Sequence, residues 1–213
     1  TTRGFPISAV PHATPRQPEG PLALPGTYQV SLTVDGRRLG APLTVQQDPR
    51  VSAPPEALAA QLRLARQLGE LLTDSSTAVL TAQSEQAQLK ALAPQGAAAD
   101  AVHAFQARLA ELLEAKEPPA DGGAAPAAPV LLPALQERIA GLYAELSRGD
   151  AGPTAAQAAA GEAARQALAG ELARWQALQA DLPALNRQLK AARLAPLRPD
   201  LAPPRDRNAA DED

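Results

Sequence analysis

The chain has 213 residues, of which 45% are apolar and only 2% aromatic, and its formal net charge is -3. A core of this composition must consist of leucine, alanine and valine, which suits closely packed helices better than a β-sandwich. The two signs of charge are interspersed, so the sequence shows no electrostatic signature of binding to nucleic acid or to anionic lipid. The absence of cysteine excludes disulfides, thiolate metal sites and cysteine nucleophiles.

The first 50 residues predict an extended arm followed by a β-hairpin. Six prolines within the first 25 residues favour the arm, in which Phe5 to Val10 alternates like a short strand. Residues Thr27 to Val34 alternate apolar and polar side chains, which predicts a strand with one buried face. Asp35 and Gly36 supply a hairpin turn, and a second strand is expected from about Leu39 to Gln47.

This hairpin needs a partner, because a two-stranded sheet is marginally stable in water. Its inward face carries Tyr28, Val30, Leu32 and Val34. An immunoglobulin-like sandwich requires about seven strands, whereas this chain offers two or three. The chain also contains no methionine, even at position 1. We therefore expect a processed or excised piece of a longer protein, with the missing strands upstream of Thr1.

Residues 51–117 predict a helical hairpin. Pro54 and Pro55 open the first helix, which is expected to extend to about Leu92, although its polar stretch from Thr73 to Thr77 could bend it. The second helix spans about Ala97 to Lys116. Their short connection predicts antiparallel neighbours. The apolar stripes comprise Leu58, Leu62, Ala65, Leu68, Leu72 and Val79 in the first helix, and Val102, Phe105, Leu109 and Leu112 in the second.

After a flexible Pro/Gly/Ala linker at 118–130, residues 131–195 are expected to complete the bundle. One helix covers about Pro133 to Arg148, and Thr154 caps a further helix that ends near Ala180. Asp181 is expected to cap a last short helix from Leu182 to Arg193. Residues 196–213 predict a disordered tail. The inward residues are Leu135, Ile139, Leu142 and Leu146, then Ala158, Gly161, Leu168, Leu172, Trp175 and Leu178, and finally Leu185 and Leu189.

The predicted fold class is therefore mainly α with a small β part. The hairpin is interpreted as the remnant of an immunoglobulin-like sandwich, and an antiparallel helical bundle follows it. No apolar run approaches the length of a membrane span.

The histidines and the single tryptophan do not form a recognisable catalytic, metal-binding or sugar-binding motif. His12 lies on the arm and His103 on a helix, without the partners that a triad or a zinc site needs. Trp175 shares a stripe with leucines, which indicates a core position rather than a platform for sugar binding. We therefore predict no catalytic, cofactor-binding or metal-binding residue and no cofactor in this chain.

Pairs of glutamates are the remaining candidates for acid and base catalysis. Glu111 with Glu114, or Glu162 with Glu171, would have to face each other across a substrate cleft to cleave a glycoside. They sit among alanine, glutamine and arginine at outward helical positions, which favours a solvated surface.

Several motifs resemble the end of large bacterial proteins with BNR-type or sortilin-like β-propellers, which are often labelled glycosyl hydrolases. These are P-G-T-Y at Pro25 to Tyr28, V-D-G at Val34 to Gly36, P-L-T-V at Pro42 to Val45 and D-P-R at Asp48 to Arg50. The stretches DLPALNRQL, from Asp181 to Leu189, and LAPL near the end also resemble that family. The S-x-D-x-G-x-T-W signature of sialidase-like blades is absent, so the resemblance transfers no catalytic residue.

The resemblance implies a non-catalytic, C-terminal structural or interaction module of an exported protein, periplasmic or extracellular. Its partners would be the protein's own upstream propeller and sandwich domains, and a protein partner or a second copy bound through the helices. One alternative is an accessory part of a glycoside hydrolase whose active site lies in upstream propellers. The other is a free-standing helical adaptor of coiled-coil type.

Overall fold

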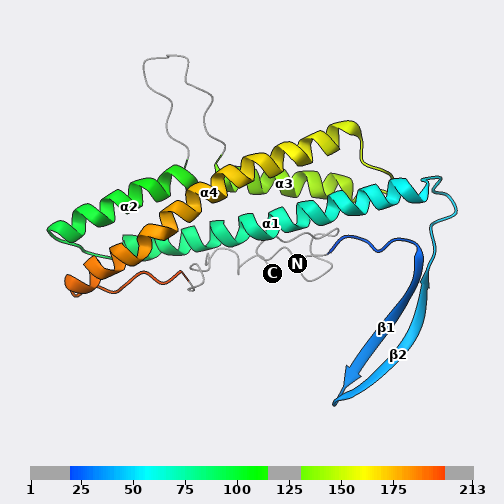
Figure 1. The fold of residues 1–213 in the computed structure, drawn as a ribbon, viewed down its shortest axis with the longest axis horizontal. Helices are drawn as coiled ribbons and strands as arrows, with labels where there is room; N and C mark the ends of the chain where they lie inside the picture. The colour runs from blue at the N-terminus through cyan, green and yellow to red at the C-terminus, as the bar shows by residue number, and fades with distance from the viewer. Residues whose placement is uncertain (1–19, 115–130, 200–213) are drawn as a thin grey trace, which may run out of the picture.

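The computed structural model describes residues 20–114 and 131–199, which form one β-hairpin followed by four helices (Figure 1). The predicted class, mainly α with a small β part, is confirmed. The expected strand at Phe5 to Val10 and the linker at 118–130 lie outside the described residues. The elements are β1 (Gly26–Val34), β2 (Arg37–Val45), α1 (Pro55–Lys90), α2 (Ala97–Leu113), α3 (Leu132–Leu146) and α4 (Ala155–Ala191).

The hairpin is regular and has the predicted turn. β1 and β2 pair antiparallel, with Tyr28 opposite Leu43 and Leu32 opposite Leu39. Asp35 and Gly36 both have positive φ, +47° and +77°, which is the requirement of the tight turn that matches the twist of two paired strands. The pair projects away from the bundle at the beginning of α1 (Figure 1).

The two longest helices, α1 and α4, run in the same direction and cross along their length (Figure 1). Near their beginnings, a Cβ atom placed on Gly161 of α4 would lie 2.7 Å from Leu64 Cδ1 of α1. Near their ends, Gln179 of α4 donates a hydrogen bond to Glu85 of α1 at 2.9 Å. Glycine therefore allows a close approach at one end of this pair, and a polar contact joins the other end.

The two shorter helices, α2 and α3, run opposite to α1 and follow one another along it (Figure 1). Gln86, near the end of α1, bonds Glu114 just after α2. Gln61, near the start of α1, donates to the backbone oxygen of Leu146 at the end of α3. α2 has 17 residues and α3 has 15, so their combined length is close to that of α1, which has 36. The described helices thus form three rods, the third made of two halves.

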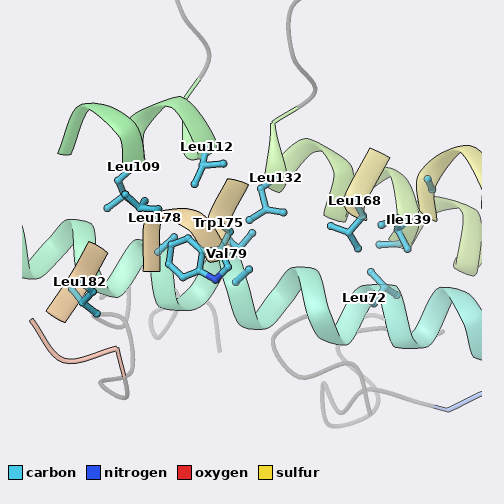
Figure 2. Packing of buried hydrophobic residues seen from close by; sticks show 14 of the residues in the cluster. Leu72, Val79, Leu109, Leu112, Leu132, Ile139, Leu168, Trp175, Leu178 and Leu182 are labelled. Carbon is cyan, nitrogen blue, oxygen red and sulfur yellow. The ribbon is translucent and has the colours of Figure 1, made fainter. Parts of the chain in front are cut away.

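The core lies between these rods and consists almost entirely of aliphatic side chains (Figure 2). Most predicted inward positions are buried, although Ala158 is exposed and its prediction was wrong. Trp175 is only 8% exposed and belongs to this cluster, which confirms its core position. The largest fully buried apolar residues are Leu68, Leu72, Leu89, Val102, Leu109, Leu132, Leu135, Ile139, Leu168, Leu178 and Leu189.

The polar stretch Thr73 to Thr77 lies within α1, which continues through it as predicted. Ser75 and Ser76 are fully buried, and each hydroxyl has a partner. Ser75 Oγ donates to the backbone oxygen of Leu72 at 3.2 Å, and Gln136 Nε2 of α3 donates to Ser76 Oγ at 2.7 Å. Because both hydroxyls are hydrogen-bonded, these hydrogen bonds offset the cost of burying the two serines in the core.

α4 begins at the predicted cap. Thr154 Oγ1 accepts a hydrogen bond from the backbone N–H of Gln157 at 3.1 Å, and Gln157 Oε1 accepts one from the backbone N–H of Thr154 at 2.9 Å. This reciprocal pair satisfies two backbone donors that the first turn leaves free.

The predicted break at Asp181 was wrong, because α4 continues through Pro183 as a single helix. Asp181 instead forms an ion pair with Arg108 of α2. The residues on either side of the proline include three buried leucines, Leu182 before it and Leu185 and Leu189 after it. Burying these side chains contributes more free energy than the one backbone hydrogen bond that proline removes, so the helix continues.

We expect Trp175→Ala to destabilise the bundle by roughly 3 to 5 kcal/mol, because the substitution removes a large buried side chain and leaves a cavity. Thermal or urea unfolding followed by circular dichroism measures this loss. Gln176→Ala, at an exposed position of the same helix, is the control and should leave the midpoint nearly unchanged. A blue-shifted tryptophan emission that does not respond to added oligosaccharide is expected, and quenching by a glycan with an unchanged midpoint in Trp175→Ala would contradict the core assignment.

Candidate functional site

The histidines and acidic residues of the described part of the chain do not assemble a metal site. His103 is exposed on α2, and His12 lies outside the described residues. Within residues 20–114 and 131–199, no group of three or more histidine, aspartate or glutamate side chains could hold a metal ion. The helices of this part of the chain include none that is both long and apolar enough to cross a membrane.

The glutamates of α4 form ion pairs with arginines of the same helix instead of a catalytic pair. Glu162 bonds Arg165 at 2.6 Å, and this arginine, helped by Gln166, lowers the pKa of Glu162 to about 2. Glu171 bonds Arg174 at 2.9 Å, and its side chain is only 13% exposed, so it is half-buried and not, as predicted, fully solvated. The two carboxylates lie nine residues apart on one helix, roughly 13 Å along its axis, so they cannot face each other across a substrate.

The second pair, Glu111 and Glu114, is on the surface. Glu111 lies 3.9 Å from Arg174 of α4, and Glu114 accepts a hydrogen bond from Gln86 of α1 at 2.5 Å. Each carboxylate therefore links α2, or its end, to a neighbouring helix. The predicted surface position is confirmed for both residues.

The most unusual ionisable group is Glu85, which the sequence analysis did not single out. Its side chain is fully buried on α1. Oε2 accepts a hydrogen bond from Gln179 Nε2 at 2.9 Å, while Oε1 has no hydrogen-bond partner among the described residues. Burial raises the pKa of Glu85 from its ordinary value of 4.5 to about 7, and the bond from Gln179 opposes part of that rise.

The sequence did contain a signal for this burial. Glu85 lies three residues after Ala82 and four before Leu89, both of which are buried, so it occupies the inward stripe of α1. A charged residue at such a position is rare in a helical core. Its burial beside Gln179 depends on the parallel arrangement of α1 and α4.

The hairpin presents an apolar face that the bundle does not cover. The pairing register places Tyr28, Val30 and Leu32 on the same face as Leu43 and Leu39 of β2. Val30, Leu32 and Leu39 are 49%, 58% and 64% exposed. The described part of the chain contains only this two-stranded sheet, so both of its outer edges also lack a neighbouring strand there.

A cavity of about 310 Å³ lies where the hairpin meets the bundle. Its lining is mostly apolar and includes Leu24, Val45 and Leu62. Two of its three glutamines bond the chain's own backbone: Gln47 donates to the oxygens of Val51 and Ala53, and Gln61 to those of Leu146 and Gly149. These amides hold the connecting segments in place, and the cavity shows no converging catalytic groups.

The chain reverses direction immediately after α4. The backbone N–H of Arg193 bonds the oxygen of Lys190, and that of Leu194 bonds the oxygen of Leu189. Arg193 has a φ of +59°, in the left-handed region. Such paired bonds around a left-handed residue form a Schellman motif, in which glycine is the usual residue at the position of Arg193.

The segment after this reversal, Leu194–Arg198, is held by two side-chain amides. Asn186 of α4 donates to the oxygen of Leu197 at 3.1 Å and accepts from its N–H at 2.7 Å. Gln88 of α1 donates to the oxygen of Arg198 at 2.9 Å and accepts from its N–H at 2.8 Å. We call Asn186 and Gln88 the amide clasp. Residues 196–199 are thus not the start of a disordered tail, because Leu197 is buried and hydrogen-bonded; residues 200–213 lie outside the described part.

Comparisons of the chain with protein-family models, with curated proteins and with solved structures found no match.

We expect the bundle to lose stability as the pH rises from about 4.5 to about 7. The pKa of Glu85 in the folded state is above its ordinary value, so the fold favours the protonated acid. This stabilisation is complete below pH 4.5, decreases between pH 4.5 and pH 7, and is lost above pH 7. The total loss in the free energy of unfolding is roughly 3 kcal/mol. Urea unfolding between pH 4 and pH 8 measures this dependence.

Glu85→Gln should remove this pH dependence of the free energy of unfolding and make the protein more stable than the wild type at pH 8. Glu137→Gln, at an exposed position of α3, is the matched control and should keep the wild-type profile. An unchanged pH profile in Glu85→Gln would show that Glu85 does not titrate as its burial requires.

Proposed function

We propose that the chain is a non-catalytic structural and interaction module that docks a β-hairpin onto a β-layer of a larger protein. The observation that carries this proposal is the exposed apolar face formed by Tyr28, Val30 and Leu32 with Leu39 and Leu43. The helical bundle serves as the support that holds the hairpin.

The difference between the two faces of the hairpin supports this proposal. The opposite face carries Thr27, Gln29, Ser31 and Thr33, with Arg38 across from Thr33. A strand pair with one apolar and one polar face is typical of a sheet that covers a core on one side. Large exposed apolar patches that polar residues surround commonly mark interaction sites.

The size of the face favours a partner within the same protein. Strands of nine residues span roughly 30 Å, and two paired strands cover a width of about 10 Å, so one face measures on the order of 300 Å². Burying both partners would remove about 600 Å² from water, whereas stable independent complexes bury at least about 1,200 Å². A covalently linked partner overcomes this deficit because its effective concentration is high.

The motifs at Pro25 to Tyr28, Val34 to Gly36 and Pro42 to Val45 support a more specific form of this proposal. They resemble the end of exported bacterial β-propeller proteins, whose own sandwich strands would supply the β-layer. In that form the module is C-terminal to the propellers and is periplasmic or extracellular.

The accessory role in a glycoside hydrolase has weaker support in this chain. The side chain that would have served as a sugar platform, Trp175, is buried. The role of a free-standing adaptor would leave the apolar face of the hairpin without a partner. Both remain alternatives to the proposed module.

Hydrogen exchange tests the docking. In the isolated chain the hairpin amides should exchange faster than those of α1, because two strands with exposed faces are marginally stable. In the protein encoded by the whole gene, the same amides should exchange at least about tenfold more slowly. Val30→Asp should abolish this slowing, since it places a charge on the apolar face.

Ser31→Asp, on the opposite face, is the matched control and should preserve the slowing. Equal protection of the hairpin and α1 in the isolated chain would contradict the need for a partner. A gene product that starts just before Thr1 and contains no further strands would contradict docking within one protein.

A further inference from the structure

We propose that the amide clasp, Asn186 and Gln88, is part of a recognition site for an extended peptide that carries a leucine. The chain's own segment Leu194–Arg198 occupies this site in the structure. The site lies at the C-terminal ends of α1 and α4 and does not involve the hairpin, so the inference is independent of the proposed function.

The hydrogen bonds of the clasp recognise a backbone rather than a sequence. Asn186 bonds both the N–H and the C=O of Leu197, and Gln88 bonds both groups of Arg198, at 2.7 to 3.1 Å. A side-chain amide that pairs with both groups of one residue imitates the edge of a neighbouring strand. Any extended peptide can form these bonds, provided that neither of the two residues is proline, which lacks an N–H.

The preference of the site for leucine follows from the burial of a single side chain. Leu197 is only 3% exposed and belongs to the hydrophobic core cluster. The side chains on either side of it, Pro196 and Arg198, are exposed. This alternation fits a ligand in which one apolar side chain is selected and its neighbours are free to vary. The ligand class is therefore an extended peptide with leucine followed by a residue other than proline.

The attachment of the chain's own segment favours exchange with such a ligand. Beyond Leu194, which packs partly buried against the core, only Leu197 anchors the segment by deep burial. The Gln88 bonds are at the exposed surface, where water competes for the same amides. The reversal also depends on Arg193 at a φ of +59°, which is unfavourable for residues other than glycine, so opening this turn relieves backbone strain.

The direct link to α4 keeps the segment at a high effective concentration beside the clasp. An external peptide must therefore displace this segment, so it binds the wild type more weakly than a variant whose own leucine is removed. Replacing Leu197 by aspartate should open the site, because the charged side chain is not compatible with the apolar position.

The test uses the full 213-residue chain and a fluorescent peptide with the sequence of residues 193–199, RLAPLRP. Fluorescence anisotropy should show that Leu197→Asp binds this peptide at least about tenfold more tightly than the wild type does. A peptide in which the same leucine is aspartate should not bind. Adding Asn186→Ala to Leu197→Asp should abolish binding, whereas adding Gln188→Ala, at an exposed position of α4, should not.

Circular dichroism should show that Leu197→Asp retains the helical content of the wild type. If this variant does not fold, Leu197→Ala replaces it, with the same expected order of peptides and double variants. A folded Leu197 variant that binds neither peptide, or both equally well, would overturn the proposal. Binding that persists after Asn186→Ala would overturn it as well, because the amide would then not recognise the backbone.

Discussion

The structure depends on the burial of leucine and alanine stripes along two long, parallel helices, α1 and α4. With an aromatic content of only 2%, the chain has few large side chains with which to fill an interior. The rods must therefore approach closely, and the position of Gly161 against Leu64 shows how little space separates α1 from α4. The helices α2 and α3 complete the core by packing end to end along this pair (Figure 1). The packing of this core thus determines the positions of Glu85 and of the two amides of the clasp.

The helical core also contains buried polar side chains, which differ in how well their hydrogen bonds are satisfied. The buried pair Ser76 and Gln136 is satisfied by a mutual hydrogen bond, so it specifies the contact of α1 with α3 at little cost. Glu85 is different, because one of its oxygens lacks a partner among the described residues. The protein compensates by holding a proton on this carboxyl up to a pH of about 7. A bundle with such a group is thus coupled to pH in the neutral range.

Two surfaces with different recognition chemistry lie at opposite ends of α1. The hairpin precedes the helix and offers apolar side chains and free strand edges. The amide clasp lies near the other end, at Gln88, and recognises backbone groups around one buried leucine. A helix of 36 residues separates them by roughly 50 Å. The hairpin and the amide clasp therefore lie far apart on the bundle and share no residue.

The sequence by itself determined the local elements. The Asp35–Gly36 turn, the cap at Thr154 and the stripes of α1 to α3 follow from short-range rules, because φ preferences, caps and helical periodicity involve residues that are close in the chain. It also indicated correctly that Trp175 is a core residue and that Glu162 is on the surface, whereas Glu171 is half-buried beside Arg174.

Only the tertiary structure decided the features that depend on contacts between distant segments. The chain continues as a helix through Pro183, because Leu182, Leu185 and Leu189 become buried against other helices. Leu197 is ordered because Asn186 and Gln88 lie beside it, 11 and 109 residues earlier in the chain. The pKa of Glu85 rises because the packed helices remove its carboxyl from water. Periodicity predicts which face of a helix is buried, but the partner that covers that face is fixed by the packing of the whole chain.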